Sequence, residues 1–207
     1  MRAFELKQRE VINITTAERI GFISDVEMDF ENAFAIDAPP YVLRYNIRNT
    51  GSIYKCAVER TNLGHDTVAN SIVGVHPEIH NYSKPSQAIK ALSLIVNRLV
   101  QKEFVSPQSI VIVSDTPYAN SILAGEDRIG AFDLVFKHYK DVTGTEICFK
   151  TAEEFKGLEA NIVIYLTHEF TNLPASSVDS RKDYVALTRA RYYLYVLNTK
   201  CKATVGE

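Results

Sequence analysis

From residue 41 onward, short apolar runs alternate with longer amphipathic runs, and this alternation limits the folds open to the chain. The run SIVIVSD at 109–115 is typical of a strand that is covered on both faces. The segment SQAIKALSLIVNRLVQKEF at 86–104 repeats its apolar residues at helical spacing. Strands that alternate with helices indicate βαβ units, and such units build a mostly parallel sheet with helices on both faces. The sequence therefore predicts an α/β fold of three layers.

The remaining elements follow from the same patterns. The expected strands are residues 41–47, 70–76, 109–115, 145–151, 160–168 and 192–198, and the expected helices are residues 50–62, 86–104, 116–125 and 176–190. Ligands of open parallel sheets bind in the loops beyond the carboxyl ends of the strands. Functional side chains are therefore expected at the junctions between strands and helices.

The N-terminal part has a different pattern of apolar and polar residues. EVINI at 10–14 and RIGFISDVEMDF at 19–30 indicate short strands with polar turns between them, and AFAI at 33–36 adds another candidate. The prolines of DAPP at 37–40 exclude a helix there. We expect a β-rich N-terminal extension over residues 1–35 and one main domain over residues 36–207.

Composition limits the function classes. The formal net charge of −2 provides no general attraction for nucleic acid, so any such contact has to be local. The three cysteines include no Cys-x-x-Cys pair, which argues against a zinc site and a disulfide framework. No apolar run approaches the length of a membrane span. We expect a cytoplasmic protein without a structural metal or a membrane partner.

Three stretches place chemically distinctive residues at predicted junctions. They are LRYNIRNTGSI with Asn46, Arg48 and Thr50, KTAEEFKGLEANIVIYL with Thr151, Lys156, Gly157 and Glu159, and DYVALTRARYYLYVL with Tyr184 and Arg189. Each stretch alone has an ordinary explanation. A single arginine is most often solvated, a KGLE sequence is most often a turn, and cations near a helix C-terminus interact favourably with the helix dipole.

In order and spacing, the three stretches resemble the conserved motifs of the second RecA-like domain of superfamily 1 DNA helicases of the UvrD/Rep/PcrA type. The family's fourth motif, approximately L-x-x-N-y-R-s-T, matches Leu43, Asn46, Arg48 and Thr50. The fifth motif, T-x-H-x-x-K-G-L-E before an apolar strand, matches Thr151 and the run Lys156 to Glu159. The sixth, Y-V-A-L/I-T-R-A-r, matches Tyr184 to Arg191. The similarity covers roughly residues 36–200.

This resemblance implies a RecA-like three-layer sandwich and a role in an ATP site between two domains. Arg189 takes the place of the arginine finger and Arg48 that of a γ-phosphate sensor, while Glu159 faces the nucleotide sugar. The resemblance also implies nucleotide binding by Lys156, Gly157 and Tyr184. It implies nucleic-acid binding by Thr151, Asn46 and Thr50. Arg191 is expected on a different side of the helix from Arg189, in a structural or solvent-facing role.

Two departures from the family pattern shape the functional expectation. The sequence has no G-x-x-x-x-G-K-[ST] phosphate loop, and no Asp-Glu pair ends an apolar strand to hold magnesium. ATP with Mg²⁺ is therefore expected only in a composite site completed by a first RecA-like domain, and the chain alone is not expected to hydrolyse ATP. Glu153 stands in place of the motif's histidine and Glu154 follows it, so two carboxylates are expected to repel a nucleic-acid phosphate here.

Other interpretations stay open from the sequence. Residues 1–30 are weakly similar to PRC-barrel proteins, with a plain β-extension as the alternative. The main domain could be a degenerate helicase-derived module that binds protein or nucleic acid without catalysis, or an α/β domain whose arginines form internal salt bridges. Burial of Arg189 within a salt-bridge network favours the last interpretation, whereas an exposed guanidinium at the carboxyl edge of the sheet opposes it.

Overall fold

The computed structural model describes residues 10–12, 19–22, 45–65, 67–168 and 178–199. The chain divides into two compact units, residues 1–42 and residues 43–207. In the first unit, β1 (Glu10–Ile12) pairs antiparallel with β2 (Arg19–Phe22), within two of the segments that the sequence predicts as strands. The expected strand at 33–36 and residues 23–30 lie outside the described residues.

The second unit contains a sheet of seven strands in the order β3-β9-β8-β4-β7-β6-β5. The strands are β3 (Glu78–Tyr82), β4 (Ile110–Ser114), β5 (Arg128–Ile129), β6 (Phe132–Val135), β7 (Glu146–Thr151), β8 (Ala160–Thr167) and β9 (Ala190–Thr199). Every neighbouring pair is parallel except β5 with β6. The predicted α/β class with a mostly parallel sheet is confirmed, and the arrangement is compatible with a RecA-like fold.

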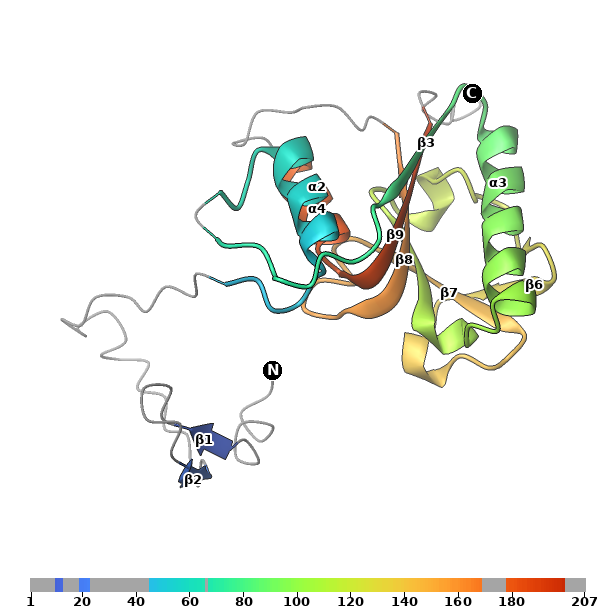
Figure 1. Ribbon diagram of the computed structural model, residues 1–207. Helices are drawn as coiled ribbons and strands as arrows, with labels where there is room; N and C mark the ends of the chain where they lie inside the picture. The colour runs from blue at the N-terminus through green and yellow to red at the C-terminus, as the bar shows by residue number, and fades with distance from the viewer. Residues whose placement is uncertain (1–9, 13–18, 23–44, 66, 169–177, 200–207) are drawn as a thin grey trace, which may run out of the picture. The chain divides into compact units, whose positions relative to one another are not determined.

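Helices cover both faces of the sheet (Figure 1). The helices α2 (Gly51–Thr61) and α4 (Val178–Leu187) lie side by side on one face, where the Ser180 hydroxyl donates to the Thr61 carbonyl at 2.6 Å. The other face is covered by α3 (Pro85–Asn97), which continues as a π-helical turn over Arg98–Lys102. Two apolar cores result, because alternate side chains of the central strands point to opposite faces. No described helix is long and apolar enough to cross a membrane.

The predicted strand at 70–76 is wrong, and the structure gives the reason. Helix α2 has no side-chain cap at Thr50, and its first N–H groups need acceptors. The N–H of Gly51 donates to the Ile72 carbonyl at 2.7 Å, and the N–H of Ser52 donates to the Val73 carbonyl at 2.8 Å. The segment therefore caps a helix instead of joining the sheet, and the nearby strand is β3.

Other predictions fail for local reasons. Residues 116–125 form only a 3-10 turn at Tyr118–Asn120, because the Ser121 hydroxyl bonds the Tyr118 carbonyl at 2.9 Å and offers the backbone an alternative to a helix. Within 41–47, the described residues contain only an isolated bridge from Tyr45 to Val68. The short strands β3, β5 and β6 are absent from the sequence-based prediction. The other predicted strands and helices are confirmed within a few residues at their ends.

Candidate functional site

The loop before α2 is held in shape by asparagine side chains. The Asn46 carboxamide oxygen accepts hydrogen bonds from the N–H groups of Arg48 and Asn49, both at 3.0 Å. Such a side-chain turn is a common use of asparagine. It directs residues 46–49 toward the start of α2 and leaves the Arg48 side chain partly exposed.

Asn49 fastens this loop to the connection between α4 and β9. Its side chain is 1% exposed, and its amide nitrogen donates to the Thr188 carbonyl at 2.9 Å and to the Ala190 carbonyl. The N–H of Thr50 donates to the Arg191 carbonyl at 3.2 Å. Two stretches more than a hundred residues apart in sequence are thereby brought together. The sequence-based prediction missed Asn49, although it lies between two motif positions.

A carboxylate lies between two arginines at this junction. Glu159 Oε2 is 3.2 Å from Arg48 Nε, and Glu159 Oε1 is 3.7 Å from Arg191 Nε. All three side chains are 43% exposed, so water and salt weaken these ion pairs. Arg191 lies on β9 and not on a helix, and its guanidinium also sits 5.2 Å from the Tyr192 ring centre. The expected helical position of Arg191 is wrong, and its side chain shares Glu159 with Arg48.

Arg189 directly precedes β9 and is 9% exposed. Its Nε donates to the Val185 carbonyl at 3.0 Å and its Nη1 to the Leu158 carbonyl at 3.2 Å, while Nη2 lies 3.4 Å from the Thr188 hydroxyl. Within the described part of the chain it forms no ion pair. Burial first, and then the nearby Arg48 charge, lower the pKa of Arg189 to about 10, against the opposing effect of Glu159. Burial is thus the main reason why the charged form of Arg189 is disfavoured, and the Arg48 charge adds to it.

These residues border a cavity of about 210 Å³. Its walls come from residues 45–49, Tyr54, Thr67, Tyr184 and residues 188–189. Tyr184 lies against the positive-φ Gly64, and burial raises the pKa of Tyr184, with the neighbouring Tyr54 acting in the same direction. The structure therefore gathers four predicted site residues around one cavity, namely Asn46, Arg48, Tyr184 and Arg189, with Glu159 paired to Arg48.

The position of this cluster in the sheet differs from the expectation. Glu159 directly precedes β8 and Arg189 directly precedes β9, so both lie at the amino ends of parallel strands. This is the edge opposite to the carboxyl ends, where ligands of open parallel sheets usually bind. The reason is that the Asn46–Thr50 loop, which carries Arg48, is fastened to the backbone at the start of β9.

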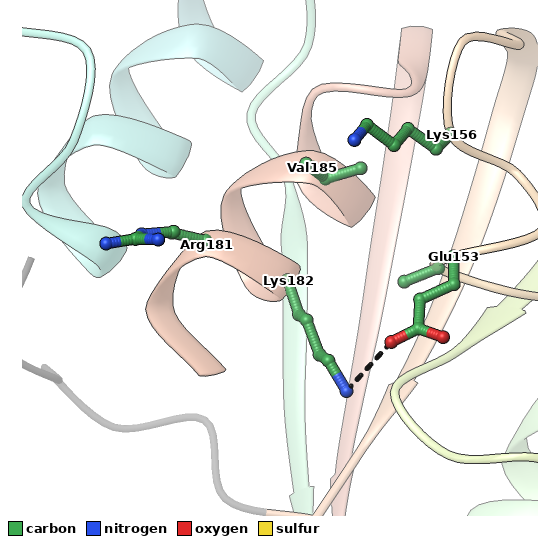
Figure 2. A pocket seen from close by; sticks show the side chains of 6 residues that line it. Glu153, Lys156, Arg181, Lys182 and Val185 are labelled. Atoms are coloured by element: carbon green, nitrogen blue, oxygen red, sulfur yellow. Dashed lines mark ion pairs between the residues drawn. The ribbon is translucent and has the colours of Figure 1, made fainter. Parts of the chain in front are cut away.

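Four predicted site residues lie elsewhere. Thr151 ends β7, at the carboxyl edge of the sheet, where its hydroxyl and N–H both bond the Glu154 carboxylate. Lys156 lines a different cavity, which lies between the turn after β7 and α4 (Figure 2). Gly157 adopts a φ of 86°, which confirms the predicted bend, and this turn separates the fifth-motif lysine from Glu159. Thr50 is 6% exposed and packs against Gly74.

The described part of the chain contains no group of three or more His, Cys, Asp or Glu side chains that could hold an ion. Glu159, the carboxylate beside Arg48, is already paired with two guanidinium groups. Two guanidinium groups contact this carboxylate, and Arg189 is close enough for Glu159 to oppose the lowering of its pKa.

Comparison with known proteins finds similarity among solved structures. No protein-family profile matches the sequence, and no curated protein matches it at a significant level. Among solved structures, the C-terminal domain of a possible DNA helicase from Lactobacillus plantarum is similar, with a TM-score of 0.51 and 11% sequence identity. The match covers 77% of this chain and 91% of that domain. The chain therefore shares its fold with a domain described as the C-terminal part of a possible DNA helicase.

Proposed function

We propose that this chain is the second motor domain of a UvrD-like, ATP-dependent DNA helicase, and that it supplies arginine side chains to an ATP site completed by a first RecA-like domain. The main observation behind this proposal is that Arg48, Arg189 and Arg191 lie near the carboxylate of Glu159. The fold similarity to the C-terminal domain of a possible DNA helicase supports the same proposal.

The electrostatics of the cluster favour an incoming polyphosphate. Three guanidinium groups face one carboxylate, and the lowered pKa of Arg189 shows that its charge is disfavoured in this surrounding. A phosphate group that enters the cavity would favour the charged form of Arg189 and accept paired N–H bonds from a guanidinium. Arg48 is the more exposed group, and we infer that it contacts the γ-phosphate first.

Arg189 requires a change of partners to act as the arginine finger. Its Nη2 has the longest of its three hydrogen bonds, 3.4 Å to the Thr188 hydroxyl, and this bond is the one most easily exchanged for a phosphate oxygen. A guanidinium placed there would stabilise the charge that grows on the γ-phosphoryl oxygens as water attacks. Magnesium ligands and the phosphate loop would come from the first domain, in the same polypeptide or another.

An exposed apolar surface beside the cavity supports a domain partner. It consists of side chains that are each at least half exposed, namely Tyr45, Ile47, Val68, Ile72, Val73 and Val75. Tyr45 and Ile47 also line the cavity. Contiguous exposed apolar groups of this kind mark interaction sites in soluble proteins. A first domain that closes over the arginines would cover them.

The first test is the binding of inorganic tripolyphosphate and of ATP to the purified chain, measured by calorimetry. Arg48→Gln and Arg189→Gln are each expected to weaken binding about tenfold, because a charged hydrogen bond is lost. Arg128→Gln is the matched control, since Arg128 is paired with Asp133 at 3.2 Å on the distant β5–β6 edge. Unchanged binding in the exposed-site variant Arg48→Gln would contradict the proposal.

ATP hydrolysis tests the half-site part separately. The chain alone, with or without single-stranded DNA, is expected to show no turnover, and Arg189→Ala is expected to behave in the same way. Turnover that is present in the natural sequence and absent in Arg189→Ala would mean that the chain contains a complete ATP site.

One observation favours a second candidate, a helicase-derived module without catalysis. All three nitrogens of the Arg189 guanidinium already have acceptors within the domain. If the module interpretation holds, tripolyphosphate will not bind, while nucleic acid or a protein still does. The calorimetric titration therefore separates the two candidates.

A further inference from the structure

Strand β9 departs from regular pairing at its start. Its first residue pairs with the first residue of β8, but its fourth pairs with the third, so Arg191 and Tyr192 together lie opposite the single residue Asn161. An extra residue of this kind interrupts the alternation of side chains along a strand and often redirects one of them beside a functional site. The irregularity includes the arginine whose Nε lies 3.7 Å from Glu159 Oε1.

Arg191 holds Glu159 only loosely. The 3.7 Å between them is longer than the 3.2 Å from Glu159 Oε2 to Arg48 Nε, and the Arg191 guanidinium also lies 5.2 Å from the ring centre of Tyr192. All three charged side chains are 43% exposed, and exposed side chains change rotamer within nanoseconds. A closer contact between Glu159 and Arg191 is therefore open to these side chains.

The backbone that carries these side chains is fixed. The N–H of Thr50, at the end of the loop that contains Arg48, donates to the Arg191 carbonyl at 3.2 Å. The N–H of the first residue of β8, which follows Glu159, donates to the Arg189 carbonyl at 3.1 Å. Hydrogen bonds thus join all three segments, and a change of ion-pair partner requires the rotation of side chains alone.

An anion in the cavity competes with Glu159 for Arg48. Among the described residues, the cavity walls include Arg48 and Arg189 but neither Glu159 nor Arg191. A guanidinium binds a phosphate best through two parallel N–H bonds, and Arg48 already presents its Nε to Glu159. A carboxylate that leaves Arg48 needs another cation, and Arg191 already faces its other oxygen.

We propose that Arg191 is a positioning residue, which takes over the Glu159 carboxylate when an anion occupies Arg48. Arg48 is thereby released from its internal counter-ion, and Glu159 keeps a cationic partner. The identity of the anion, the polyphosphate of a nucleotide, rests on the proposed function. The exchange of partners rests on the contacts of the three side chains and not on that function.

The test is calorimetric titration of the full chain with inorganic tripolyphosphate. Arg191→Gln is expected to weaken binding about threefold, because Glu159 then stays on Arg48, and to change it less than about 1.5-fold when Glu159→Gln is also present. Arg191→Lys should keep most of the natural affinity, since an ammonium group also holds a carboxylate. Arg128→Gln is the matched control, because this exposed arginine pairs with Asp133 at 3.2 Å on another edge of the sheet.

Two results would overturn the proposal. An equal loss from Arg191→Gln with and without Glu159→Gln would mean that Arg191 acts on the anion directly or through its charge alone. Unchanged binding in Arg191→Gln would mean that Glu159 needs no second partner. Circular dichroism of each variant verifies that it is folded.

Unfolding in urea tests the exchange without any anion. The coupling between Arg191→Gln and Glu159→Gln, as a ratio of unfolding equilibrium constants, is expected to be about twofold in the natural sequence and about fivefold in Arg48→Gln, where Glu159 has lost Arg48. A coupling that does not increase in Arg48→Gln would count against the exchange. If the natural protein does not bind tripolyphosphate, the proposed function fails, and this coupling still decides whether Arg191 takes over Glu159.

Discussion

Arg48 Nε lies 3.2 Å from Glu159 Oε2, and this pair links the loop before α2 to the residue that precedes β8. Glu159 also faces Arg191 at 3.7 Å and opposes the lowering of the pKa of Arg189. One carboxylate therefore moderates the repulsion among three guanidinium groups. It also competes with any anion that approaches them.

Removal of this carboxylate should strengthen anion binding. Glu159→Gln is expected to raise the affinity for inorganic tripolyphosphate two- to fivefold, while the free energy of unfolding falls by less than about 1 kcal/mol because the pair is exposed. Calorimetry and urea unfolding measure the two effects. The control is Asp133→Asn, which removes the partner of Arg128 at another edge and should leave tripolyphosphate binding unchanged.

The lowered pKa of Arg189 gives a pH dependence with a definite sign. Its folded-state pKa of about 10 lies below the usual arginine value, so the folded domain releases this proton at lower pH than the unfolded chain does. Below pH 10 this group adds no pH dependence, and above it the stability contribution rises with pH. Tripolyphosphate affinity should therefore fall as pH rises beyond about 10 and should lack this step in Arg189→Gln. Calorimetric titrations between pH 7 and pH 11 test this, and the same step in both proteins would contradict it.

Asn49 should be sensitive to the loss of its amide hydrogens. Asn49→Asp keeps the size of the side chain but leaves the carbonyls of Thr188 and Ala190 without their donor, inside a site that is 1% exposed. We expect a loss of about 2 kcal/mol or more in the free energy of unfolding, measured in urea. Asn81→Asp is the control, because Asn81 acts as an acceptor from Asn198 at 2.8 Å, a role that a carboxylate retains. An equal effect of the two substitutions would count against this account.

Gly74 should not tolerate a side chain. Its φ is 72°, and an added Cβ would collide with the Thr50 side chain at the start of α2. Gly125 has a similar φ of 84° but open space around it. Gly125→Ala should thus lower stability by about 1 kcal/mol through backbone strain alone, and Gly74→Ala should lower it by about 2–3 kcal/mol. Thermal unfolding of both variants isolates the collision, and equal losses would show that the Thr50 contact is unimportant.

Elements with strong local patterns were predictable from the amino-acid sequence. Strands β4, β7, β8 and β9 are apolar runs, and α3 repeats its apolar residues at helical spacing, so burial alone dictates their form. The motif order also singled out Arg48, Glu159 and Arg189, which the structure brings to one junction. Short strands such as β5 and β6 have too few residues for a period to show.

Contacts between residues that are far apart in the sequence could be identified only from the folded structure. The segment at 70–76 is apolar enough for a strand, but its carbonyls are taken by the first N–H groups of α2. Asn49 acquires its role only because the α4–β9 connection offers two carbonyls. Lys156 and Glu159 are three residues apart, yet the bend at Gly157 separates their side chains. Lys156 lines the cavity between the turn after β7 and α4, whereas Glu159 pairs with Arg48. Hydrogen bonds and charges across such separations carry no periodic signal, and only the folded chain specifies which groups meet.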